Sequence, residues 1–297
     1  MRVVDRFGGK LVAIAGVACV LGVLACGSGG SATPTPSAPA LAIGVKEQAP
    51  VKTVVGGFLH DVTYDSAGRQ VRAYLVVPDG RGPFAPVLFA HWYTGRNGAD
   101  RSEFLEEATG LLKLGVVSLL PQGQFPWKED PSGIGHDQAA IANQVADLKA
   151  GLDVLLAQAG VDSGRAAFVG HDYGAMHGVL LLASDPRVKA AVLMAADAQW
   201  VTWFGAYWSF LKTDVQKADY ARQMAALDPV ALMPRVKAAL LLQFANQDEF
   251  ISRAQADQVA AAASSNRKVS FYDSSHELNA AAASERRDWL TKVLALV

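Results

Sequence analysis

From Val51 onward, short apolar and β-branched runs alternate with longer amphipathic stretches along the chain. The runs have the length of β-strands, and the stretches have the length of α-helices. Strands that are separated by helices form a mostly parallel sheet, because the crossover helix brings the next strand back in the same direction. The alternation therefore predicts one α/β domain, with helices on both faces of a central sheet.

The domain is expected to begin with an antiparallel hairpin, in which the turn residues Asp65-Ser66-Ala67-Gly68 separate two runs that are rich in β-strand-forming residues. The expected strands are 54–64, 70–77, 86–91, 116–120, 166–170, 189–194, 237–244 and 268–272. The expected helices are 101–114, 138–158, 175–183, 254–263 and 285–296. After the sixth main strand, residues from about 198 to 234 are expected to form a short lid.

The N-terminus has the pattern of an export signal. Arg2, Arg6 and Lys10 precede an apolar run from residue 11 to 24, which is short for a membrane span. The run ends in Leu24-Ala25-Cys26-Gly27, which resembles the bacterial lipoprotein box. The resemblance implies that residues 1–25 are a signal peptide and that Cys26 carries a lipid. Cleavage without lipid attachment is the alternative.

Residues 26–45 are expected to be a flexible tether, since Gly27 to Ala40 is rich in Ser, Gly, Thr and Pro and has no large apolar side chain to bury. Residues 46–297 then form the folded domain. We expect the protein in the cell envelope, anchored by its lipid on the outer side of the bacterial cytoplasmic membrane or in the periplasm. Secretion is the alternative.

The composition excludes several kinds of chemistry and partner. Hydrophobic residues make up 51% of the chain and charged residues 19%, which supports a folded domain with an extensive core. The net charge is -1 and no long basic block is present, so nucleic acid is not expected as a partner. Cys19 and Cys26 are the two cysteines, and neither lies in the domain. Disulfides, thiol nucleophiles and zinc–thiolate clusters are therefore excluded there.

One strand-to-helix junction carries a specific motif, Gly170-His171-Asp172-Tyr173-Gly174. Glycines two places before and after the central residue allow strand and helix to pass closely in a sharp turn. The motif resembles the nucleophile elbow of the α/β-hydrolase superfamily, with Asp172 where a serine usually stands. The form with aspartate resembles epoxide hydrolases and haloalkane dehalogenases. The plainer interpretation is that Asp172 only caps the helix.

The superfamily order of nucleophile, acid and histidine implies partners for Asp172 after the last strands. Asp248 follows strand 237–244 and His276 follows strand 268–272, so Asp248 is expected to orient His276, which acts as base. Glu249 is the reserve acid. Taken singly, Asp248 would be a turn residue and His276 a surface histidine.

The resemblance also implies an oxyanion hole made by the backbone N–H groups of Tyr93 and Tyr173, although Trp92 replaces the glycine expected before Tyr93. The substrate pocket is expected to include His91, Trp92, Trp200, Trp203 and Tyr207. Most aromatic residues of the lid are otherwise expected to pack its underside. His171 and His177 are expected to be packing residues and His60 to be exposed on the hairpin.

Over residues 51–297 the chain resembles the α/β-hydrolase superfamily, and its strand spacing and compact lid resemble dienelactone-hydrolase-like members. A carboxylate can attack a saturated carbon without a base, whereas water needs His276 to break the resulting ester. The first hypothesis is an exported hydrolase of a small epoxide or organohalide. The alternatives are a dienelactone-hydrolase-like esterase and a catalytically silent envelope protein. A small molecule is the expected substrate, the lipid on Cys26 is the expected membrane contact, and no cofactor or metal is implied.

Overall fold

A computed structural model describes residues 38–93, 100–125, 133–207 and 211–297. The chain separates into two units at residues 36 and 37, and the second unit, Ser37–Val297, contains all of the described residues. The predicted signal peptide and Cys26 lie outside the described residues. The predicted tether is described only from residue 38, and the first strand begins directly after it, at Lys46.

The described domain is built on one ten-stranded sheet with the order β1-β3-β4-β6-β5-β7-β8-β9-β10, and β2 pairs with β3. The strands are β1 (Lys46–Glu47), β2 (Lys52–Val54), β3 (Gly57–Ser66), β4 (Arg69–Pro78), β5 (Ala85–Ala90), β6 (Val116–Pro121), β7 (Ala167–His171), β8 (Ala190–Met194), β9 (Ala239–Ala245) and β10 (Arg267–Tyr272). From β6 to β10 all neighbouring strands are parallel, whereas β3, β4 and β6 pair antiparallel. The predicted sheet and its opening hairpin are confirmed.

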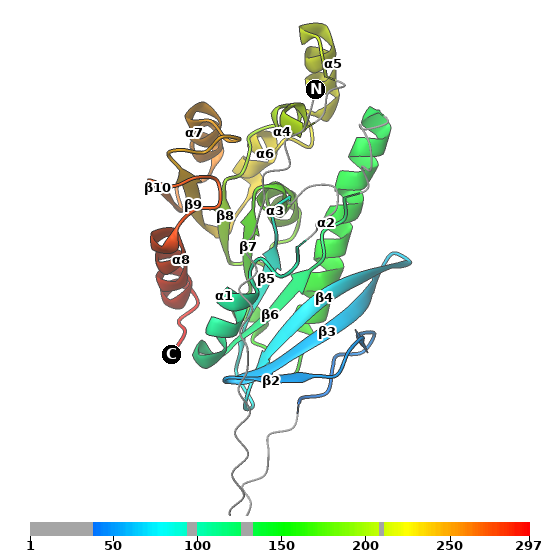
Figure 1. Cartoon of the computed structure of the whole chain (residues 1–297), viewed down its shortest axis with the longest axis vertical. Helices are drawn as coiled ribbons and strands as arrows, with labels where there is room; N and C mark the ends of the chain where they lie inside the picture. Colours follow the sequence, from blue (N-terminus) through cyan, green and yellow to red (C-terminus); the bar gives the residue numbers. More distant parts are fainter. Residues whose placement is uncertain (1–37, 94–99, 126–132, 208–210) are drawn as a thin grey trace, which may run out of the picture. The chain divides into compact units, whose positions relative to one another are not determined.

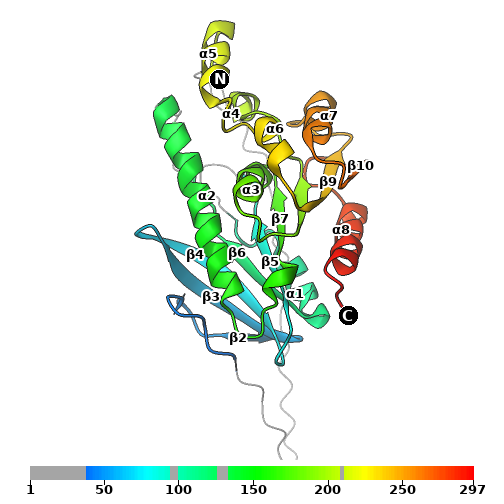
Figure 2. The same cartoon turned by 180° about the vertical axis from the view of Figure 1, so that it is seen from behind.

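Helices cover both faces of this sheet (Figures 1 and 2). They are α1 (Leu105–Gly110), α2 (Ile134–Leu156), α3 (Tyr173–Ser184), α4 (Trp200–Tyr207), α5 (Asp214–Met224), α6 (Pro229–Leu232), α7 (Arg253–Ala262) and α8 (Ala280–Val293), with short 3-10 turns η1 (Leu112–Leu114), η2 (Ser163–Arg165) and η3 (Met233–Arg235). On one face, α1 and α8 bury side chains such as Ala108 and Leu290. On the other face, α2, α3 and α7 bury Leu148, Val179 and Val259.

Several predicted boundaries were wrong for local reasons. The helix expected at 101–114 is shorter than predicted and is limited to α1. Residues 101–104 form turns, and a short 3-10 turn, η1, follows α1. This turn ends at Gly115, whose φ is 68°. The strands β1 and β2 were not predicted. His60 was expected to be exposed, but it is 1% exposed and its Nδ1 lies 3.0 Å from Glu47 Oε2, because β1 pairs with β3 beside it.

The segment between β8 and β9, which was predicted as a lid, contains α4, α5, α6 and η3. Thr213 and Gln216 form a capping box at the start of α5. Trp200 and Trp203 of α4 are buried against Tyr173 of α3, and Phe204 is buried against these two tryptophans. None of the helices in the described part of the chain is both long and apolar enough to cross a bilayer.

Candidate active site

The turn between β7 and α3 holds Asp172 in a backbone conformation that side chains rarely adopt, with φ 49° and ψ -113°. Such strain persists only where the surrounding structure enforces it, and it is common at functional sites. The Asp172 N–H donates to the carbonyl of Met194 on β8 at 2.8 Å. The sharp turn expected at this motif is therefore present.

The two flanking glycines are required by close backbone contacts. A Cβ atom on Gly174 would lie 2.1 Å from the carbonyl oxygen of Ala90, at the end of β5. A Cβ atom on Gly170 would lie 2.8 Å from the carbonyl oxygen of Gly174. Only glycine lets α3 start this close to β5, and this close approach places Asp172 beside the loop that follows β5.

The Asp172 carboxylate is 1% exposed and accepts two hydrogen bonds. Its Oδ1 accepts from the indole Nε1–H of Trp203 at 2.7 Å, and its Oδ2 accepts from the backbone N–H of Tyr93 at 3.3 Å. The side chain makes no capping hydrogen bond to α3 within the described structure. These contacts distinguish Asp172 from a simple helix cap, since the carboxylate is turned toward the lid and the β5 loop.

Asp248 and His276 meet as predicted at the ends of β9 and β10. His276 Nδ1 lies 3.0 Å from Asp248 Oδ1 and 2.9 Å from Oδ2, and the two side chains are 6% and 1% exposed. Asp248 Oδ1 also accepts the backbone N–H groups of Phe250 and Ile251. Glu249, the reserve acid, is exposed.

The pKa values of both partners are shifted by this pairing. Burial raises the pKa of Asp248, but the hydrogen bonds from His276 and the backbone outweigh it and leave the pKa below its ordinary value. Burial lowers the pKa of His276, but the Asp248 hydrogen bond and the charges of Asp172, Asp248 and Glu103 raise it above 6.5. The charge of Asp172 is thus one of the causes that raise the pKa of His276.

The loop after β5 is held by the side chain of His91. The Nδ1–H of His91 donates to the carbonyl of Trp92 at 2.7 Å, and its Nε2 accepts from the N–H of Gly123 at 2.8 Å. Burial lowers the pKa of His91, which favours this neutral ring. His91 was predicted to line the pocket, but its two ring nitrogens bind backbone instead.

Of the other predicted pocket residues, Trp92 stacks on His276 with ring centroids 6.0 Å apart, and Trp203 contacts Asp172. Trp200 is fully buried and donates its indole N–H to the carbonyl of Leu227, so it has a packing position rather than a pocket one. The side chain of Tyr207 lies outside the described residues. Tyr173 opens α3, and its N–H direction stays a prediction.

Sequence reasoning missed two buried or half-buried carboxylates near these loops. Glu103 bonds to the backbone N–H of Trp92 and to His171, and no motif marked it. Asp197, just after β8, is 1% exposed and accepts hydrogen bonds from Thr202 and Gln255. The strand-end rule that found Asp248 could have found Asp197. Burial is the main cause that raises the pKa of Asp197 to about 6.

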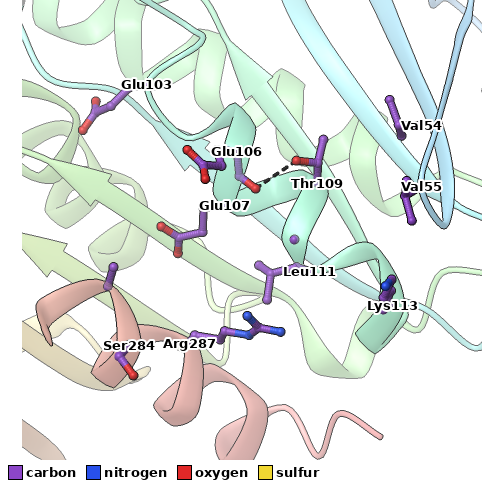
Figure 3. Close-up of a pocket in the computed structure, with 12 residues that line it drawn as sticks. Val54, Val55, Glu103, Glu106, Glu107, Thr109, Leu111, Lys113, Ser284 and Arg287 are labelled. Atoms are coloured by element: carbon purple, nitrogen blue, oxygen red, sulfur yellow. Dashed lines mark hydrogen bonds between the residues drawn. The ribbon is translucent and has the colours of Figure 1, made fainter. Parts of the chain in front are cut away.

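A groove of about 990 Å³ lies elsewhere, between α1 and α8, and includes Glu106, Glu107 and Arg287 (Figure 3). Its lining reaches Glu103 but does not include Asp172 or His276. Among the residues that the structure describes, no cluster of His, Cys, Asp and Glu side chains could hold a metal ion. The candidate site is therefore the set of loops around Asp172.

No protein-family model matches the sequence, and no curated protein matches it. Solved structures do match the fold. Acetyl xylan esterase 1 from Thermoanaerobacterium sp. JW/SL YS485 is 13% identical, with a TM-score of 0.67 over 84% of this chain and 87% of that chain. The acetyl xylan esterase from Paenibacillus sp. R4 is 19% identical, with a TM-score of 0.66 over 85% and 89%.

A third structure, from Klebsiella pneumoniae subsp. pneumoniae MGH 78578, is named provisionally as a dienelactone hydrolase. It is 17% identical, with a TM-score of 0.56 over 77% of this chain and 95% of that chain. Together with the strand order, these similarities show that the chain has the α/β-hydrolase fold. The expected fold class is thus confirmed.

Proposed function

We propose that this chain is a hydrolase of small molecules in which His276, oriented by Asp248, activates water beside Asp172. The observation that carries the proposal is the buried contact of both Asp248 oxygens with His276 Nδ1. A carboxylate on Nδ1 fixes the ring tautomer, so that Nε2 is the nitrogen that takes a proton from water. The silent-protein alternative gives no reason for such an oriented base.

The comparisons favour the esterase alternative. The structural neighbours are named as acetyl xylan esterases and, provisionally, a dienelactone hydrolase, and they give the resemblance to epoxide hydrolases and dehalogenases no support. The first candidate is therefore hydrolysis of a small carboxylic ester or lactone. The resemblance is one of fold, so the ester class remains a proposal for this chain.

For an ester, the site would act through water. Attack by Asp172 on the ester carbonyl would produce an anhydride, which is a poor intermediate. Instead, His276 takes a proton from water, the water oxygen attacks the carbonyl carbon, and His276 returns the proton to the leaving alcohol oxygen. The backbone N–H of Tyr93 would have to leave the Asp172 carboxylate to stabilise the oxyanion.

A second candidate is favoured by the hydrogen bonds on Asp172. Trp203 Nε1–H and Tyr93 N–H each hold one carboxylate oxygen in a buried site. In this route, one Asp172 oxygen attacks a saturated carbon, the leaving group departs with the bonding electrons, and an alkyl ester forms. His276 then activates water, which attacks the Asp172 carbonyl carbon while Tyr93 N–H stabilises the oxyanion.

One experiment separates these two routes. Wild type in excess over substrate is allowed a single turnover in ¹⁸O-labelled water, with esters, lactones, epoxides and haloalkanes as substrates. Direct attack by water leaves ¹⁸O in the acid product and none in the peptide that contains Asp172. The alkyl-ester route gives an unlabelled alcohol and puts ¹⁸O into Asp172. No turnover of any substrate class would contradict the proposed function.

A trapping experiment with variants tests the second route further. His276→Ala should still be alkylated but should not hydrolyse the ester, because only the water step needs a base. The Asp172 peptide should gain the mass of the substrate in His276→Ala and not in Asp172→Asn. Full turnover by Asp172→Asn, after deamidation is excluded, would remove Asp172 as the nucleophile.

The location of the protein is also a proposal. The basic residues before the apolar run and the box around Cys26 support export and a lipid anchor. We propose that the hydrolase acts outside the cytoplasm, held at a membrane through Cys26. The partners are then a small-molecule substrate and the membrane itself.

A further inference from the structure

The two oxygens of the Glu103 carboxylate join two different parts of the chain. Oε2 accepts the backbone N–H of Trp92 at 2.7 Å, and Oε1 lies 2.7 Å from Nδ1 of His171. The side chain is 15% exposed and that of His171 is 1% exposed. Glu103 therefore links the loop after β5 to the residue that precedes Asp172.

His171 extends this link to the loop after β10. Its second ring nitrogen, Nε2, lies 3.1 Å from the backbone carbonyl oxygen of His276. A carboxylate lies beside Nδ1 and a carbonyl oxygen beside Nε2, so both ring nitrogens face acceptors. A single buried ring thus connects Glu103 to the backbone of the residue proposed as base.

The side chain of Trp92 contacts the rings of both histidines. Its indole stacks on His171 with centroids 5.1 Å apart and an angle of 17°, and on His276 at 6.0 Å and 11°. The N–H of the same residue is the one that Glu103 holds. The next N–H along the chain, that of Tyr93, points at Asp172.

We propose that Glu103 is a positioning residue that, through Trp92 and His171, sets the Tyr93 N–H and the His276 ring relative to Asp172. Glu103 does not touch the reacting atoms in either candidate route. Its effect comes from holding two loops that would otherwise move separately. A displacement of about 1 Å in such a site can cost about a hundredfold in rate.

The chain offers a matched control. Glu106 is exposed and lines the same groove as Glu103, three residues away (Figure 3). Removal of either carboxylate changes the charge of this groove equally, but only Glu103 contacts Trp92 and His171. Glu106→Ala therefore reports the loss of a carboxylate from the groove. Glu103→Gln, in contrast, removes a charge that raises the pKa of His276 and keeps an acceptor for the Trp92 N–H.

The kinetic test rests on the proposed function and uses a substrate that wild type hydrolyses. We expect Glu103→Ala to lower kcat by about tenfold to a hundredfold with KM within about twofold, since the binding surface is kept and the reacting groups are misplaced. Glu103→Gln should lower kcat less than Glu103→Ala does, because its amide oxygen can still accept the Trp92 N–H. Glu106→Ala should keep wild-type values. Wild-type kcat in folded Glu103→Ala would overturn the proposal.

A second readout needs no substrate and separates this proposal from the proposed function. The Nδ1–H proton of His276 in its bond to Asp248 should give a downfield NMR signal, identified by its loss in Asp248→Ala. We expect this signal to shift in Glu103→Ala and to stay in place in Glu106→Ala. An unchanged signal in Glu103→Ala would overturn the proposal. If that variant does not fold, Glu103→Gln decides, because its amide NH2 group replaces one of the two oxygens that face the Trp92 N–H and His171 Nδ1.

Discussion

At the scale of single residues, the site depends on a few side chains that three loops bring together. Asp172, Asp248 and His276 could be found from the sequence because each follows an apolar strand, and the ends of parallel strands meet at one edge. Glu103 could not be found this way. It lies in a turn before α1, and its contact with His171 is made across 68 residues of chain.

Gly174 should be the least replaceable residue of the elbow. Its missing Cβ leaves room for the Ala90 carbonyl, which would lie only 2.1 Å from the added atom. We expect Gly174→Ala to lose about 3 kcal/mol or more of unfolding free energy in urea titrations. Gly205→Ala is the control, because an added Cβ there meets nothing within 4 Å. This control variant should gain up to about 1 kcal/mol of unfolding free energy, because alanine favours a helix such as α4 more than glycine does. Equal stability of the two variants would contradict this account of the turn.

The pH dependence of hydrolysis should report the His276–Asp248 pair. His276 acts as base only when neutral, and its pKa is raised above 6.5 because the Asp248 bond and nearby negative charges outweigh its burial. Activity should therefore fall as the pH drops, with the acid limb of kcat centred above pH 6.5, since a complete turnover needs the base in both candidate routes. Asp248→Asn should move this midpoint downward. A midpoint at or below 6.5 in wild type would contradict the proposed base.

At the scale of elements, the long periodic segments were predictable and the short ones were not. Helices α2, α3 and α7 were expected near their observed places, because each is a stretch of helical length that lies between two recognisable strands. The two-residue β1 and three-residue β2 are too short to have a pattern. They form because β3 offers an edge to pair with.

The base of the predicted lid should be sensitive to pH through Asp197. Burial is the largest cause that raises its pKa from 3.8 to about 6, against hydrogen bonds from Thr202, Gln255 and the backbone that lower it. A raised pKa favours the folded state at low pH, and this contribution is lost as the pH rises through about 6. We therefore expect wild type to lose about 2 kcal/mol relative to Asp197→Asn between pH 4 and pH 7.5.

Urea unfolding at the two pH values measures this difference. Asp219→Asn is the control, because Asp219 is an exposed residue of the neighbouring helix α5. The unfolding free energy of Asp219→Asn should change with pH in the same way as that of wild type. If Asp197→Asn shows the same pH dependence as wild type, the buried carboxyl does not titrate as described.

At the scale of the whole molecule, the α/β class and its mostly parallel sheet followed from the alternation of strands and helices, whereas the α/β-hydrolase fold was implied by the resemblance of the motif around Asp172. The substrate could not be predicted from the fold, since one fold supports many reactions. A carboxylate at position 172 would favour attack on a saturated carbon, whereas the structural neighbours are themselves named as acetyl xylan esterases and a dienelactone hydrolase. Only an experiment that shows whether Asp172 forms a covalent ester can decide between the two candidate routes.

The anchor is a second property of the whole chain. Expressed in a bacterium with lipoprotein processing, wild type should partition with membranes, because a lipid on Cys26 adds hydrophobic area outside the domain. Cys26→Ser should appear in the soluble fraction. Cys19→Ser is the control, since Cys19 lies inside the apolar run of the expected signal. Equal partitioning of all three proteins would rule out the lipid anchor.

The central claim is that His276 activates water for hydrolysis, and the rate of His276→Ala on a substrate of the wild-type enzyme tests it most directly. Both candidate routes need this base, so the account predicts that steady-state turnover falls by about a thousandfold or more while the variant stays folded. A folded His276→Ala that hydrolyses the same substrate at the wild-type rate would contradict it.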